Sequence, residues 1–105
     1  MHVKVVSLEK CSATGLTISF VNEVAREMGV EIDFEHAIVK TREDAIEHRH
    51  IGSPTVQING IDIDPGARAI NQFGITWRRY GASSMPSKDL IEEAFLEALQ
   101  KKASG

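Results

Sequence analysis

The first third of the chain alternates between strand-like and helix-like spacing of apolar positions. The run Val3–Leu8 is mostly apolar, which predicts a buried strand. From Leu16 to Met28 the apolar side chains recur near helical spacing, and Gly29 is typical of a helix C-terminus. The segment Val30–Glu35 alternates strictly between apolar and polar residues, which predicts a strand with one covered face.

Capping signals delimit two further helices. Thr41 followed three residues later by Asp44 predicts a capped helix N-terminus, and this short helix should end near His48–His50. Ser87 can cap the last helix. The last helix carries one apolar stripe, made of Leu90, Ile91, Ala94, Phe95, Ala98 and Leu99.

A hairpin signal lies between these two helices. Pro54–Ile58 and Ile61–Ile63 have strand-like composition, and the Asn59-Gly60 pair between them is the strongest short-range signal for a tight hairpin turn. The hairpin predicts an antiparallel pair of strands.

The order of elements predicts an α/β fold. Asp64–Ile75 reads as a loop, or as a loop with one helical turn, and Thr76–Tyr80 has strand-like residues. Because the first three strands alternate with helices, they need parallel or crossover connections. We therefore expect a mixed four- or five-stranded sheet flanked by helices.

Composition restricts the class of protein. The chain has 105 residues, one cysteine and a formal net charge of −3, which fits one domain over residues 1–105 and excludes an internal disulfide framework and a cysteine-rich zinc site. The mild acidity argues against nucleic acid as a partner. No apolar run reaches the ~20 residues of a membrane span, and no signal peptide is recognisable, so we expect a cytoplasmic protein that does not bind membranes.

Two motifs carry a family resemblance. Cys11 follows the first strand and precedes a helix, and Ser53-Pro54-Thr55-Val56 opens a strand some 40 residues later. Together they resemble the thioredoxin-like superfamily, and Pro54–Gly60 is similar to glutaredoxins and small glutaredoxin-like proteins. The resemblance covers Val3–Ile63, and the last helix fits it too. It implies a thioredoxin-like fold, a cis peptide bond before Pro54, and a Ser53 backbone that pairs with an extended thiol substrate or glutathione.

The sequence departs from that family at its active site. The usual Cys-x-x-Cys motif is replaced by Cys11-Ser12-Ala13-Thr14, so Thr14 stands where the resolving cysteine would be. The Gly-Gly-x-Asp type sequence that holds glutathione in glutaredoxins is replaced by Asp64-Pro65-Gly66-Ala67, and the Cys-Gly-Phe-Ser motif of cluster-binding monothiol glutaredoxins is not matched. The resemblance therefore implies a monothiol site.

Cys11 is the candidate nucleophile. A helix N-terminus favours the thiolate, Lys10 adds a positive charge, and the Thr14 hydroxyl could donate a hydrogen bond to the sulfur. We predict thiol–disulfide exchange or deglutathionylation through a mixed disulfide on Cys11, with Thr14 tuning the thiol. Substrate-binding residues would be Lys10, Ser12, Ser53 and Pro54. We expect no bound cofactor, glutathione as a co-substrate, and a thiol or disulfide protein or glutathione as partner.

Other interpretations remain open from the sequence. Cys11 could be a small packed residue without chemistry, in which case the domain would be a non-catalytic module whose groove binds a protein or small molecule. The histidines His36, His48 and His50 could donate to a metal, but we predict no metal site because nothing shows that they converge. Trp77–Tyr80 has aromatic and basic residues but reads more simply as a strand with a solvated edge, and it or a sheet edge could form a homodimer.

Overall fold

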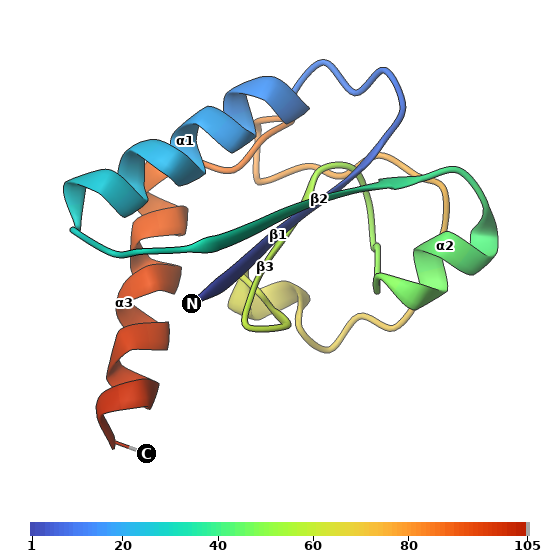
Figure 1. The fold of residues 1–105 in the computed structure, drawn as a ribbon. Helices are drawn as coiled ribbons and strands as arrows, with labels where there is room; N and C mark the ends of the chain where they lie inside the picture. The colour runs from blue at the N-terminus through green and yellow to red at the C-terminus, as the bar shows by residue number, and fades with distance from the viewer. Residues whose placement is uncertain (105) are drawn as a thin grey trace.

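A computed structural model describes residues 1–104 and has the predicted α/β architecture (Figure 1). The strands are β1 (His2–Leu8), β2 (Asp33–Val39), β3 (Thr55–Ile58) and β4 (Ile61–Asp62). The α-helices are α1 (Thr14–Glu27), α2 (Arg42–Glu47) and α3 (Lys88–Ser104), and a 3-10 turn η1 spans Pro65–Ala67. None of the helices within residues 1–104 combines the length and apolar character that spanning a membrane requires.

The four strands form one mixed sheet in the order β2-β1-β3-β4. Strands β1 and β2 are parallel, whereas β3 is antiparallel to both β1 and β4. Asn59 and Gly60 form the turn between β3 and β4 with φ of 52° and 81°, the positive values that a tight hairpin turn needs. The prediction of a mixed sheet with an antiparallel hairpin is confirmed.

Helices cover both faces of the sheet. On one face, Val3 and Val5 of β1 pack into a core with α1 and α3. Ile91 and Phe95 of α3 are fully buried in this core. On the other face, Val6 of β1 packs with Ala45 of α2 in a smaller core. Because successive side chains of a strand point to opposite faces, this double coverage explains why β1 has apolar residues on both faces, Val3 and Val5 on one and Val6 and Leu8 on the other.

The capping predictions are confirmed. Thr41 and Asp44 form a reciprocal capping box at the start of α2, and the Ser87 hydroxyl accepts the Leu90 N–H at 3.1 Å in α3. Gly29 follows α1 with φ of 66°, which suits a residue without a Cβ.

Two predicted strands differ from the structure. The second strand begins at Asp33 rather than Val30, because its register follows β1: His2 pairs with Asp33, and the Asp33 N–H donates to Met1 O at 2.8 Å. Thr76–Tyr80 is not a strand; of its residues, Trp77 and Tyr80 take part only in isolated bridges. The solvent exposure predicted for Thr76–Tyr80 is also wrong in part, because Arg78 is buried.

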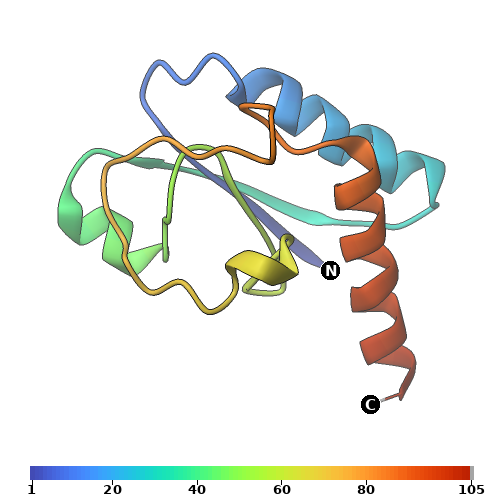
Figure 2. The same ribbon diagram turned by 180° about the vertical axis from the view of Figure 1, so that it is seen from behind.

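A long connection leads from η1 to α3. This segment, residues 68–87, runs from η1 past α2 and then crosses to the N-terminal end of α1 before it enters α3 (Figure 2). On its way the Gly74 N–H donates to His50 O at 3.1 Å and the Thr76 carbonyl accepts from the Ser53 N–H at 2.9 Å. The 68–87 segment thereby packs against the loop that precedes β3.

Close packing of this segment predicts that a larger residue at Gly52 destabilises the protein. Gly52 has φ of 151°, and a Cβ there would lie 2.6 Å from the Arg78 Cβ. We expect Gly52→Ala to lower the free energy of unfolding by about 2 kcal/mol or more, measured by urea denaturation. Gly15→Ala is the matched control, because a Cβ at Gly15 meets nothing within 4 Å. Equal stability of the two variants would contradict the prediction.

Burial of His50 predicts a pH-dependent stability. The side chain is fully buried, and its Nδ1 lies 2.8 Å from Gly74 O. Burial lowers the pKa of His50 although the contact with Gly74 opposes the shift. Below about pH 6.5 the unfolded chain protonates His50 more readily than the folded protein does. The free energy of unfolding should therefore be at its full value above about pH 6.5 and fall as the pH is lowered further. Urea denaturation at about pH 7.5 and pH 5.5 should show this loss for the wild type and a smaller loss for His50→Asn, which retains a donor.

Candidate functional site

Cys11 lies in the connection between β1 and α1. A turn follows Leu8, with Lys10 in the left-handed region at φ of 62°, and the Thr14 N–H donates to Cys11 O at 3.3 Å as α1 begins. The residue before the helix is Ala13, which cannot supply a side-chain cap. Backbone N–H groups of this turn are therefore available to the sulfur, and Cys11 is partly exposed.

Ser53 connects the thiol to the backbone of β1. Its hydroxyl oxygen accepts the Leu8 N–H at 3.0 Å, and the same hydroxyl acts as a donor that lowers the pKa of the Cys11 thiol. Ser53 is buried and precedes a cis peptide bond to Pro54, which is the isomer that the family resemblance implies. The loop before β3 thus brings a donor to a sulfur that is distant in sequence.

Hydrogen bonds lower the pKa of the Cys11 thiol below its ordinary value. Burial acts in the opposite direction and is the largest single influence, but it is outweighed by the side chains of Ser53 and Thr14 and by the backbone at Ala13 and Thr14. Thr14 Oγ1 is buried and has no partner of regular hydrogen-bond geometry within residues 1–104, and its side chain lowers the pKa of Cys11 less than that of Ser53 does. Hydrogen-bond donors stabilise the negatively charged thiolate, so the lowered pKa gives Cys11 a larger thiolate fraction than an unperturbed cysteine has.

The 68–87 segment forms the opposite wall of the site. Ser53 pairs with Trp77 in a parallel bridge: the Ser53 N–H donates to Thr76 O at 2.9 Å, and the Arg78 N–H donates to Ser53 O at 3.2 Å. Both backbone groups of Ser53 therefore already have partners within the chain. The pairing with an extended substrate that the resemblance implies for the Ser53 backbone is not open in this arrangement.

Arg78 and Tyr80 fix this wall. The Arg78 guanidinium donates to both carboxylate oxygens of Asp62 at 2.8 Å and lies over the Tyr80 ring, 4.3 Å from its centroid. The Tyr80 hydroxyl donates to Pro54 O at 2.5 Å, and burial raises the pKa of Tyr80. From the sequence, Arg78 and Tyr80 were expected in a solvated strand and not in the site. Their two-residue spacing, which places both side chains on one face of an extended segment, is a signal that could have indicated a shared role.

A cavity of about 360 Å³ lies over the thiol. Of the residues predicted from the sequence, Cys11, Ser12 and Ser53 line it, whereas Lys10, Thr14 and Pro54 do not. Lys10 is exposed and Pro54 is buried. The other lining residues come from the turn before α1 and from the 68–87 segment: Ala13, Trp77, Arg78, Arg79 and Ser84. The Trp77 side chain is 62% exposed and gives the cavity one aromatic wall.

The histidines lie apart in different surroundings. His36 is 2.9 Å from the Ser7 hydroxyl, His48 is 3.1 Å from the Lys4 ammonium, and His50 is buried against Gly74. Within the described part of the chain, no group of three or more His, Cys, Asp or Glu side chains is arranged to hold a metal ion.

The hydrogen bond from Ser53 predicts how the thiol titrates. Ser53→Ala removes the donor, so we expect the pKa of Cys11 to rise, measured by the pH dependence of alkylation with iodoacetamide. The substitution also leaves the buried Leu8 N–H without its acceptor, which should lower the free energy of unfolding by about 1–3 kcal/mol. Ser12→Ala, at an exposed position of the same cavity, is the control and should change neither quantity. An unchanged pKa in Ser53→Ala would contradict this account of the thiol.

Comparison with known proteins returns no relative. No protein-family model matches the chain, and neither a curated protein nor a solved structure is significantly similar to it. Over residues 1–104 the chain forms an α/β domain with a mixed four-stranded sheet, in the order β2-β1-β3-β4, and three α-helices.

Proposed function

We propose that this protein is a monothiol thiol–disulfide exchange protein with a thioredoxin-like fold. The observation that carries the proposal is the partly exposed Cys11 thiol, which has a lowered pKa and faces a cavity. The position of Cys11 after β1 and of the cis Ser53–Pro54 bond before β3 supports the family resemblance. So does the strand order, with β1 parallel to β2 and antiparallel to β3.

The reaction uses two external sulfur compounds. The Cys11 thiolate attacks one sulfur of a disulfide, the S–S bond breaks, and the leaving thiolate takes a proton from water. Cys11 then holds a mixed disulfide. Because the chain has one cysteine, a second thiol from solution must attack this mixed disulfide, form a new disulfide and return Cys11 as a thiolate.

Glutathione is a suitable source of both sulfurs. A glutathionylated protein or glutathione disulfide would provide the first substrate, and reduced glutathione would release the adduct. A reducing compartment such as the cytoplasm, where we place the protein, would keep Cys11 reduced. Of the substrate-binding residues predicted from the sequence, Ser12 and Ser53 line the cavity and would contact a substrate there, whereas Lys10 and Pro54 do not line it.

A binding module is the second candidate. It is favoured because the Ser53 N–H and carbonyl are already paired with Thr76 and Arg78. The Ser53 backbone is therefore not open to an extended thiol substrate. In such a module the cavity beside the exposed Trp77 would bind a protein or small molecule without chemistry on Cys11. Reactivity of the thiol separates the two candidates.

Adduct formation tests the proposed exchange. We expect wild-type protein incubated with glutathione disulfide at about pH 6.5 to gain one glutathione, and added reduced glutathione to remove it, as followed by intact-mass analysis. The reaction should be several-fold faster than that of the same protein unfolded in urea, because the folded thiol has the lower pKa. Cys11→Ser should form no adduct. An equal rate in the folded and unfolded protein would overturn the exchange proposal and favour the module.

A variant tests the role assigned to position 14. Thr14→Cys restores the Cys-x-x-Cys spacing, and the introduced thiol should attack the mixed disulfide and release glutathione without added thiol. Ser12→Cys places the extra sulfur beside Cys11 instead and is the matched control, in which slower release is expected. Persistence of the adduct in Thr14→Cys would contradict the thioredoxin-like arrangement of the site.

A further inference from the structure

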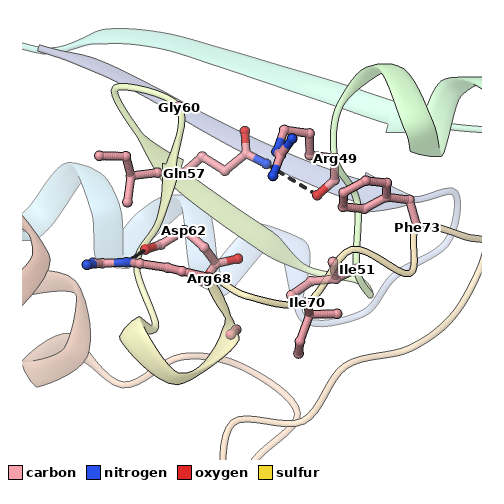
Figure 3. Close-up of a pocket in the computed structure, with 10 residues that line it drawn as sticks. Arg49, Ile51, Gln57, Gly60, Asp62, Arg68, Ile70 and Phe73 are labelled. Atoms are coloured by element: carbon pink, nitrogen blue, oxygen red, sulfur yellow. Dashed lines mark hydrogen bonds between the residues drawn. The ribbon is translucent and has the colours of Figure 1, made fainter.

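A second cavity, of about 200 Å³, contains none of the residues that line the thiol cavity. It lies between the β3–β4 hairpin, η1 and the first part of the 68–87 segment (Figure 3). Ile51, Ile70 and Phe73 give it apolar walls, and Arg49 lies beside Phe73. Ile70 is 45% exposed, so this apolar surface is open to solvent.

The charges around the cavity are neutralised except at Arg49. Asp62 accepts hydrogen bonds from Arg78 on both carboxylate oxygens. Arg68 donates to both oxygens of Glu97, at 2.9 and 2.6 Å. Arg49 has no carboxylate partner within residues 1–104, and its guanidinium lies 5.2 Å from the centroid of the Phe73 ring. The lining therefore presents one uncompensated positive charge on an aromatic support.

The backbone at Arg49 is held in a conformation that favours glycine. Its φ is 53°, which is uncommon for a residue with a Cβ. The buried Gln57 side chain fixes this turn, because its Nε2 donates to His48 O at 2.9 Å and to Arg49 O at 3.4 Å. The positive φ belongs to the C-terminal cap of α2, where the Arg49 N–H donates to Ile46 O at 3.2 Å and the His50 N–H donates to Ala45 O at 2.8 Å. The cap fixes the position of Arg49, and its guanidinium over Phe73 at the cavity is the observation that points to a ligand.

We propose that this cavity binds a small carboxylate with a flat apolar body. The carboxylate would accept hydrogen bonds from the Arg49 guanidinium, a pairing that suits the planar geometry of both groups. The apolar body would pack against Phe73, Ile51 and Ile70. A cavity of about 200 Å³ is smaller than the roughly 300–1,000 Å³ of drug-sized sites, which limits the ligand to a size near that of benzoate.

Benzoate and benzamide are matched probes, because they share size and shape and differ in charge. We expect benzoate to shift amide NMR signals of the wild-type protein around Ile51, Ile70 and Phe73, with a dissociation constant of about 1 mM. Benzamide should bind about tenfold or more weakly, since it cannot form the charged hydrogen bonds. Equal binding of the two probes, shifts elsewhere in the protein, or no shifts at about 20 mM benzoate would overturn the proposal.

Arg49→Gly separates ligand binding from folding. Glycine relieves the positive φ, so we expect this variant to unfold at an equal or higher temperature than the wild type and yet to lose benzoate binding about tenfold or more. Arg49→Lys retains the charge and should keep part of the affinity. Unchanged benzoate binding in Arg49→Gly would overturn the proposal. Because the cavity does not include Cys11, its ligand binding is tested independently of thiol exchange.

Discussion

The buried ion pair between Arg78 and Asp62 holds the 68–87 segment against the sheet, and the wall of the thiol cavity depends on it. The side chains are 7% and 11% exposed. Removing one partner of such a pair leaves an uncompensated buried charge, typically at a cost of about 3–5 kcal/mol. The Arg78 backbone meanwhile pairs with Ser53, and Tyr80 reaches Pro54. One residue thus couples the hairpin, the long connection and the loop that carries the donor to Cys11.

The same ion pair lies between two cavities with different chemistry. Arg78 lines the cavity over Cys11, and Asp62 lines the cavity beside Arg49. Since each charge neutralises the other, neither cavity receives a free charge from this pair. The chemical character of each cavity is then set by its remaining groups, a hydrogen-bonded thiol beside an exposed indole in one and an unpaired guanidinium on a phenyl ring in the other.

Local signals predicted the elements that local interactions stabilise. The capping box of Thr41 and Asp44 and the Asn59-Gly60 turn satisfy their hydrogen bonds and backbone angles within a few residues, so their sequence is sufficient evidence. The start of β2 could not be found in this way, because pairing with β1 selects Asp33 and the alternating pattern does not. Leu16 followed the helical spacing yet is 56% exposed, since the neighbouring Thr17 turns inward and bonds to Ala13 O.

The amino-acid sequence alone was enough to predict that the one cysteine stands between a strand and a helix, with threonine three residues later. That result follows from the number of cysteines and from the order of residues along the chain, and folding changes neither. The surroundings of the Cys11 sulfur, in contrast, are set by tertiary contacts. The Ser53 donor, the closed Ser53 backbone and the Arg78–Asp62 pair join residues that are distant along the chain. Such contacts depend on how the sheet and the 68–87 segment pack together, and periodicity along one segment contains no information about them.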